Sequence, residues 1–326
     1  MDDLPPPPYT PTDSNHSITS SDPIVHIAAT IDHITGDASQ SLAPMRTTLI
    51  EEESGYNAPA RPKLKPNPDL GHALHAAVVK GDVPMINTLL QHGACANTRP
   101  TTKKPALVIA VERGDYDTVR KILEHSEPDL EAKAPGGATA LYTAVSRGEK
   151  LMVQLLLAHG ANPNAKPSGS PPALFKAYKN GYKEIVQAML EAPSLDVNAT
   201  PPGGTSTLWH AAEAVDREIL QSLLEHGAKV DLKPPGQATA MYRAAVRGDQ
   251  HTAEALLGYG AKVDAKPPGG STALWQAADQ GNQSIVRLLL GHGANVNAKP
   301  AGCETALTRA SKKGNGDMVR LLLEYC

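Results

Sequence analysis

Residues 140–148 read Ala-Leu-Tyr-Thr-Ala-Val-Ser-Arg-Gly, and variants of this segment recur eight times at a spacing of 33 or 34 residues. Its second place is always apolar, and the eight occurrences are Leu74, Leu107, Leu141, Leu174, Leu208, Met241, Leu274 and Leu307. A fixed period of this size indicates a repeat array, in which each unit buries its apolar face against its neighbours. Such an array has no single central cavity, so it favours presenting an extended surface to another macromolecule.

The unit at residues 265–297 predicts two short helices. Thr272 is a candidate N-cap for the first helix, and Gly281 ends it where a left-handed residue is needed. Apolar residues at i, i+3 and i+4 give each helix one face to bury: Leu274, Ala277 and Ala278 in the first helix, and Ile285, Leu288 and Leu289 in the second, which ends at Gly293.

These residues resemble ankyrin repeats, whose signature reads Thr-Pro-Leu-His-x-Ala, then Gly, then Val-x-x-Leu-Leu and Gly-Ala-x-x-Asn. The resemblance covers residues 67–326 as about eight repeats, the last truncated. It implies an all-α solenoid of helix pairs joined by short β-hairpin fingers, with a concave binding face. The chain departs from the signature where alanine replaces the proline in most repeats and where Val215 replaces the helix-ending glycine. One extra residue after the second helix, around Pro128 and Pro193, predicts looser loops there.

The fingers carry a recurrent turn signal. Proline followed by glycine suits the two central places of a type II turn, because the second place needs a positive φ. The pairs are Pro135-Gly136, Pro202-Gly203, Pro235-Gly236 and Pro268-Gly269, and Gly169 and Gly302 hold the same glycine place. We therefore expect stiff fingers, which lower the entropy lost on binding.

An aromatic column replaces the histidine of the signature. The eight positions read His75, Val108, Tyr142, Phe175, Trp209, Tyr242, Trp275 and Thr308, and they include both tryptophans and the only phenylalanine. Packing between repeats is one interpretation. The other is that the rings of Tyr142, Phe175, Trp209, Tyr242 and Trp275 contact a partner, since Trp and Tyr are favoured interface anchors.

Two basic columns accompany the rings. The finger column holds Arg99, Lys133, Lys166, Lys233, Lys266 and Lys299, interrupted by Thr200. The helix-end column holds Lys80, Arg113, Arg147, Arg247 and Lys313, interrupted by Asn180, Ala214 and Gln280. They are interpreted either as solvated charge or as a positive lining that attracts an acidic partner.

Residues 1–66 are rich in Pro, Ser, Thr and Asp, carry a net charge of −5 and predict a disordered tail. The remainder carries +2. Within the tail, Pro6, Pro7, Pro8 and Tyr9 match Pro-Pro-x-Tyr, which resembles the ligands of WW domains, including those of certain ubiquitin ligases.

Catalytic and targeting signals are missing from the sequence. It has no phosphate-binding Gly-x-x-x-x-Gly-Lys-Ser/Thr, no His-Glu-x-x-His and no metal-like spacing of Cys95, Cys303 and Cys326. It also lacks an apolar run long enough to span a bilayer, and its N-terminus is unlike a secretory signal. We expect a monomeric, non-catalytic protein-binding scaffold of the cytoplasm or nucleus, with no cofactor, metal, nucleic acid or membrane partner. The alternatives are a ubiquitin-pathway adaptor or substrate, and a fragment of a larger protein whose catalytic domain is absent.

Overall fold

The computed structural model describes residues 68–98 and 104–326. The chain divides into two units, Met1–Pro62 and Lys63–Cys326, and all described residues belong to the second. Within these residues there are sixteen helices in eight pairs. In chain order the pairs are α2 (Pro68–Lys80) with α3 (Val83–Gln91), α4 (Ala106–Arg113) with α5 (Tyr116–His125), α6 (Ala140–Arg147) with α7 (Lys150–Ala158), α8 (Ala173–Lys179) with α9 (Lys183–Leu190), α10 (Thr207–Ala214) with α11 (Arg217–Glu225), α12 (Ala240–Arg247) with α13 (Gln250–Gly258), α14 (Ala273–Gln280) with α15 (Gln283–Gly291), and α16 (Ala306–Lys312) with α17 (Gly316–Leu323).

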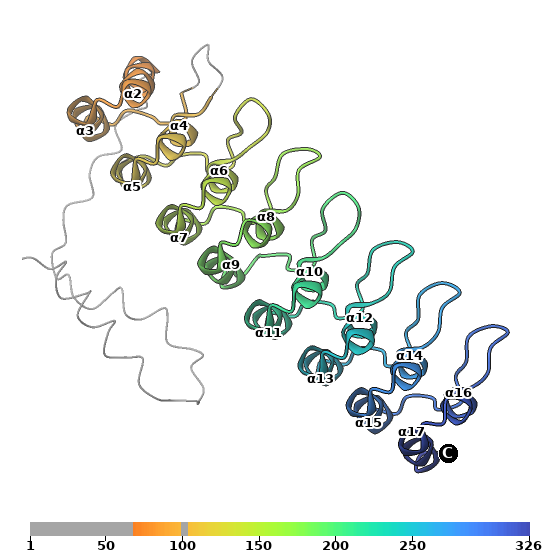
Figure 1. Cartoon of the computed structure of the whole chain (residues 1–326). Helices are drawn as coiled ribbons and strands as arrows, with labels where there is room; N and C mark the ends of the chain where they lie inside the picture. Colours follow the sequence, from red (N-terminus) through yellow and green to blue (C-terminus); the bar gives the residue numbers. More distant parts are fainter. Residues whose placement is uncertain (1–67, 99–103) are drawn as a thin grey trace, which may run out of the picture. The chain divides into compact units, whose positions relative to one another are not determined.

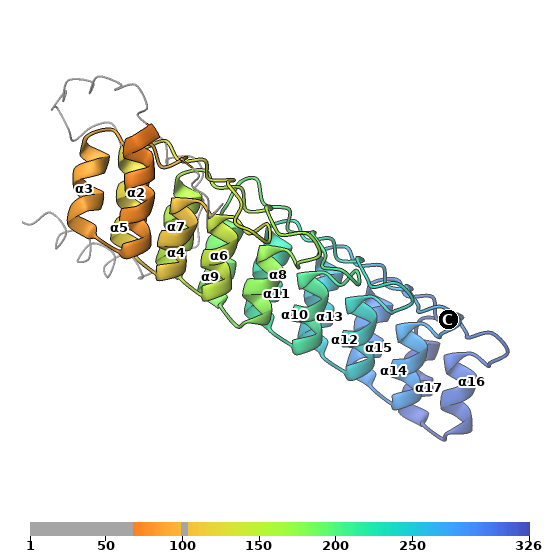
Figure 2. The same ribbon diagram turned by 90° about the horizontal axis from the view of Figure 1, so that it is seen from above.

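Each pair is one repeat, and the repeats stack in chain order (Figure 1). The first helices form one row and the second helices another, as the view from above also shows (Figure 2). The loops that join one repeat to the next project beyond the row of first helices, and we call these loops the fingers. No β-strand occurs among the described residues, so the fingers are turns rather than the regular hairpins that the sequence predicted.

Capping residues fix the start and end of the helices. The Thr272 hydroxyl accepts the Trp275 backbone N–H at 3.3 Å, and Gly281 ends α14 at φ 77°, which confirms both predictions. Val215 occupies the same place after α10 at φ 58°, and it is the one non-glycine residue with positive φ among the described residues. A β-branched residue is strained in this conformation.

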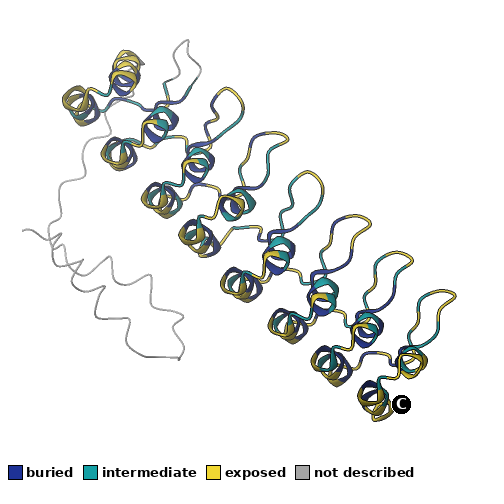
Figure 3. Ribbon diagram, viewed as in Figure 1, coloured by how far each residue is buried: buried dark blue, intermediate teal, exposed yellow. Residues whose placement is uncertain are grey.

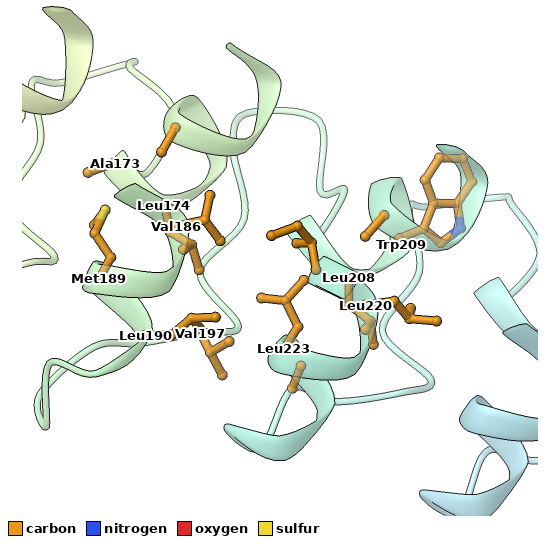
Figure 4. Close-up of a cluster of buried hydrophobic side chains, with 14 of the residues drawn as sticks. Ala173, Leu174, Val186, Met189, Leu190, Val197, Leu208, Trp209, Leu220 and Leu223 are labelled. Atoms are coloured by element: carbon orange, nitrogen blue, oxygen red, sulfur yellow. The ribbon is translucent and has the colours of Figure 1, made fainter. Parts of the chain in front are cut away.

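Small residues on the first helices let successive repeats approach closely. Ala110, Ala144, Ala177, Ala211 and Ala244 are fully buried at equivalent places, and leucines of both rows fill the space between the helices. In Figure 3 the buried residues lie on the sides of the helices that face neighbouring helices, and exposed residues lie at the fingers and on the outer sides of the helices. In Figure 4, Leu208, Leu220 and Leu223 lie between α10 and α11, while Trp209 lies on the other side of α10.

Candidate binding surface

Each described finger from the third repeat onward closes with the same turn. The backbone N–H of the fourth turn residue donates to the carbonyl of the first, as from Gly137 to Ala134 at 2.8 Å and from Gly270 to Pro267 at 2.9 Å. The third turn residue is glycine with positive φ, for example 101° at Gly136 and 68° at Gly269. Positive φ in the third place defines a type II turn, so the turn prediction is confirmed.

A lysine directly precedes this turn in five of six fingers. These residues form the finger row: Lys133, Lys166, Lys233, Lys266 and Lys299. All five are exposed, and none makes an ion pair or a side-chain hydrogen bond with another described residue. Thr200 fills the equivalent place in the remaining finger, and Arg99 lies outside the described residues. The finger row is thus a set of exposed lysines, without ion pairs among the described residues, that each precede a turn of the same type.

The helix-end column behaves differently, because three of its five cations, Arg113, Arg247 and Lys313, bind backbone carbonyls of the preceding repeat. Arg113 donates to the Val79 carbonyl at 3.1 Å, and Arg247 donates to the Ala212 carbonyl at 2.7 Å. Arg147 pairs with Glu149 at 3.5 Å in its own repeat. The Val79 and Ala212 carbonyls lie in the last turns of the preceding first helices, where a cation complements the helix dipole. Arg113, Arg147, Arg247 and Lys313 are thus engaged within the array, and the binding of a partner by Arg147 and Arg247 stays a prediction.

In the fifth and seventh repeats, one carboxylate binds two cations of the next repeat. Glu213 pairs with Arg243 at 2.6 Å and with Arg247 at 2.7 Å. The hydrogen bond from Arg243, with help from Arg247, holds the pKa of the Glu213 carboxyl below its ordinary value. Two repeats later, Lys313 and Arg309 lower the pKa of Asp279 in the same way. These clusters hold repeats together.

The aromatic column lies in the junctions between repeats. Trp209 is 7% exposed, and its indole N–H donates to the Ala238 carbonyl of the next repeat at 3.1 Å. Trp275 is 8% exposed and donates to the Glu304 carbonyl at 2.9 Å. Both acceptors directly precede the N-cap of the following first helix. The structure therefore favours the packing interpretation for these two indoles.

The other rings of the column differ in burial. Tyr142 is buried, with Lys176 above its ring at 5.0 Å, whereas Phe175 and Tyr242 are half-buried. The Phe175 ring meets His210 edge-on at 5.2 Å between centroids. Burial, followed by the charge of Lys179, lowers the pKa of His210. The half-buried rings are the members of the column that keep surface for a partner.

A ladder of hydrogen bonds, which we call the polar ladder, runs along the bases of the fingers, and it was not predicted from the sequence. A side-chain oxygen of one repeat accepts a backbone N–H of the next, for example Asn164 from Asp196 at 2.8 Å and Asn198 from Lys229 at 2.7 Å. The further acceptors are Asn97, Glu131, Asp231 and Asp264. The last residue of the Gly-Ala-x-x-Asn signature recurs at these places and was the available signal. The ladder fixes each finger against its neighbour.

Two cavities lie against the loops that carry an extra residue. One, lined by Pro128, Asp129 and Leu107 among others, measures about 30 Å³. The other, about 310 Å³, is lined by Leu190, Pro193, Leu195, Val197 and His226 among others. No group of three or more His, Cys, Asp or Glu side chains capable of holding a metal occurs among the described residues. Neither cavity gathers the nucleophile, base and oxyanion donors that a catalytic site needs.

Comparison with known proteins defines the class. The chain matches the family described as ankyrin repeats (3 copies) over residues 74–167, 107–201, 174–267, 208–300 and 241–326. These matches together span most of the chain, which therefore belongs to the ankyrin repeat family. No helix of the described part is long and apolar enough to cross a membrane. The three cysteines, all in the described part, are unpaired.

Individual relatives share the repeats over part of their length. The chain is 33% identical over 149 residues to an ankyrin repeat and KH domain-containing protein, mask-1, of Caenorhabditis elegans, covering 45% of the chain and 6% of that protein. It is 31% identical over 118 residues to a putative E3 ubiquitin-protein ligase, XBAT34, of Arabidopsis thaliana, covering 36% of the chain and 31% of that protein. The crystal structure of the ankyrin repeat domain of Bcl-3, a member of the IkappaB protein family, superposes with a TM-score of 0.51 at 25% identity, covering 76% of this chain and 97% of that one.

Proposed function

We propose that this chain is a non-catalytic scaffold that binds an acidic segment of a partner protein along its fingers and the adjoining concave face of the first helices. Ankyrin repeats are protein-interaction modules, which supports the general part of the proposal. The finger row carries the specific part. Its lysines are exposed and make no ion pair or side-chain hydrogen bond with another described residue, whereas four of the five helix-end cations are engaged by carbonyls or carboxylates.

Charge of this kind favours association with an anionic surface. Each exposed lysine–carboxylate contact contributes about 0.2–1 kcal/mol, so a row of them gives useful affinity only when several act together. The type II turns and the polar ladder hold the lysine backbones in place before a partner arrives, which reduces the ordering cost of binding. Long-range attraction also speeds the encounter at low salt.

The first helices contribute the remaining contacts in this proposal. Phe175 and Tyr242 offer half-buried rings, and Arg147 keeps exposed surface beside its ion pair with Glu149. Trp209 and Trp275 act indirectly, because their N–H groups anchor the residue before the next N-cap and so orient the fingers. In this arrangement the fingers supply the charge and the first helices supply the apolar contact.

A photo-crosslinking residue maps the surface that a partner contacts. Gln237, exposed at the end of a finger turn, is replaced by benzoylphenylalanine in the full chain. The matched control carries it at Tyr259, which is 44% exposed just after α13 in the row of second helices. We expect partner adducts from position 237, mapped by mass spectrometry to an acidic segment. Adducts from position 259 alone would contradict the proposal.

A second candidate function is supported by the N-terminal residues. Pro6, Pro7 and Tyr9 match a WW-domain ligand, and the ankyrin repeats of the relative named a putative E3 ubiquitin-protein ligase are 31% identical to this chain. In this proposal the array holds one protein while the motif recruits a WW-domain protein of the ubiquitin pathway. The motif lies outside the described residues. Proximity labelling with the full chain and with a variant lacking residues 1–66 tests it: loss of WW-domain proteins from the labelled set is expected, and an unchanged set would contradict it.

We assign no catalysis to the repeats, and we place their action in the cytoplasm or nucleus as a monomer. The unpaired Cys95, Cys303 and Cys326 support a reducing compartment. Activities named for longer relatives belong to those proteins, of which this chain spans only a part. Sedimentation at increasing concentration tests the monomer, because the exposed Leu323 and Tyr325 at the end of the array would favour self-association.

A further inference from the structure

We infer that the finger row recognises an extended segment in the polyproline II conformation with an acidic residue in every third place. The inference rests on the proposed function and adds to it the conformation and the charge spacing of the partner. Three observations carry it: the regular spacing of the lysines, the close approach of neighbouring fingers at Gly137 and Gly204, and the interruption at Thr200.

Two pairs of neighbouring fingers approach each other so closely that one added methyl group would touch the next finger, so their lysines lie near one another at the backbone. A methyl group placed on Gly137 would lie 3.4 Å from Cα of Pro167 in the next finger. One placed on Gly204 would lie 3.0 Å from Cδ of Pro235. The fingers follow the stacking of the helices, whose axes pack about 8–10 Å apart. Each step along the row is therefore roughly 10 Å or slightly less.

A polyproline II segment matches this step between lysines, and it places every third side chain on the face that would meet the finger row. It rises about 3.1 Å per residue with three residues per turn, so every third side chain lies on the same face about 9 Å further on. A β-strand fits less well, because side chains on one face repeat at about 6.6 or 13 Å. An α-helix would need about seven residues, or roughly 10.5 Å, for each step, and its side chains would drift by about 20° per step, so they would leave the common face over the five steps of the row. Acidic, proline-containing segments therefore fit the row best.

The interruption at Thr200 predicts which places of the partner segment carry acidic residues. Two lysines precede it and three follow it, so the six places read charged, charged, neutral, charged, charged, charged. A matching segment carries acidic residues in places 1, 4, 10, 13 and 16, or in places 1, 4, 7, 13 and 16 if it runs in the opposite direction. Because two lysines lie on one side of Thr200 and three on the other, the row selects both the spacing of the acidic residues and the direction of the partner chain.

A polypeptide is favoured over a nucleic acid by the character of the same surface. Single-stranded nucleic acids are held by aromatic side chains on which the bases stack. In the described fingers no aromatic residue accompanies the lysines, and the rings of Trp209 and Trp275 are buried in the repeat junctions. A phosphate chain also carries a charge at every nucleotide, which the interruption at Thr200 would not discriminate.

Fluorescence anisotropy of the full chain with labelled synthetic peptides tests the inference. The probes are 16-residue peptides of Pro, Ser and Thr with five Glu in either of the two registers above. The control has the same composition with its five Glu consecutive. At low ionic strength we expect one of the two registered peptides to bind at least 5-fold more tightly than the control. Lys266→Ala should weaken that binding about 2- to 5-fold, the range set by one exposed ion pair.

The interruption at Thr200 is tested with a registered peptide that carries a sixth glutamate in the place opposite Thr200. It should change the affinity of the wild-type chain less than 2-fold and raise that of the Thr200→Lys variant about 2- to 5-fold. Equal binding of registered and consecutive peptides would overturn the inference, as would no binding of either. Tighter binding of a labelled 16-nucleotide oligothymidylate would overturn it in favour of nucleic acid. If the crosslinker at position 237 still captures an acidic partner, only the spacing has failed; if it captures none, the proposed function has failed as well.

Discussion

Replacing Trp209 by alanine should lower the free energy of unfolding of the array, and this effect does not depend on the identity of the partner. The ring is 7% exposed, its N–H donates to the Ala238 carbonyl at 3.1 Å, and the Arg243 guanidinium lies 5.4 Å from its centroid. Removing a buried Trp side chain costs about 3–5 kcal/mol, and the lost hydrogen bond and cation contact place this site in the upper half of that range. We therefore expect a loss of about 4 kcal/mol in the free energy of unfolding.

The assay is guanidinium unfolding of the full chain followed by far-UV circular dichroism, with the slope of the transition compared between variants. A changed slope would show that the repeats no longer unfold together. Trp209→Phe keeps most of the apolar contact but leaves the Ala238 carbonyl without its donor, so it should cost about 1–2 kcal/mol. Tyr259→Ala, at a ring that is 44% exposed, is the control and should change the free energy by less than about 1 kcal/mol.

The opposite outcome would refute the assignment of the ring to packing. If Trp209→Ala lost less than about 1 kcal/mol while partner binding collapsed, the indole would be an interface anchor instead. Trp275→Ala should behave like Trp209→Ala, because Trp275 makes the same contacts with Glu304 and Arg309 two repeats later.

Three further predictions concern backbone strain, pH and the N-terminal motif. Val215→Gly should stabilise the array by about 1 kcal/mol, because glycine adopts positive φ without strain, whereas the control Val246→Gly inside α12 should destabilise it; thermal melts that show no gain for Val215→Gly would count against the strain. The Glu213 carboxyl has a pKa lowered by Arg243, so its contribution is complete above its ordinary pKa of about 4.3 and is lost as the pH falls through the lowered value. The difference in melting temperature between wild type and Glu213→Gln should therefore shrink between pH 7 and pH 3, and a difference that stays constant would contradict the assignment. A peptide of residues 1–16 should bind at least one of a panel of WW domains, and Tyr9→Ala should remove most of the affinity without altering the melting temperature of the array; equal titrations of both peptides would remove the support for recruitment.

Much of the fold was predictable because its period constrains every repeat at once. The N-cap at Thr272, the left-handed glycine at Gly281 and the type II turns each recur several times, so chance matches are excluded by repetition. Val215 shows how strong that constraint is. Its backbone keeps positive φ because the N–H groups of Val215 and Asp216 still bind the carbonyls of Ala212 and Ala211, as they do in repeats that have glycine.

The binding surface was only partly predictable, because two basic columns look alike in sequence. Arg247 and Lys233 differ in their contacts, because Arg247 donates to the Ala212 carbonyl of the preceding repeat whereas Lys233 makes no ion pair or side-chain hydrogen bond with another described residue. A backbone carbonyl has no residue type, so it leaves no pattern to read. The same holds for the indoles of the aromatic column, whose acceptor carbonyls lie 29 residues further along the chain.

Charge reversal on the finger row tests the central claim most directly. The Kd of the partner captured at position 237 is measured by calorimetry for the full chain, for Lys233→Glu/Lys266→Glu/Lys299→Glu, and for a control with the same change in net charge, Lys150→Glu/Lys229→Glu/Lys262→Glu. All six lysines are exposed, so both variants should fold. We expect the finger variant to weaken binding at least 10-fold, with a smaller dependence on salt, and the control variant to weaken it less than 3-fold. Equal losses in the two variants would show that net charge alone governs binding, and an unaffected finger variant would show that the partner binds elsewhere.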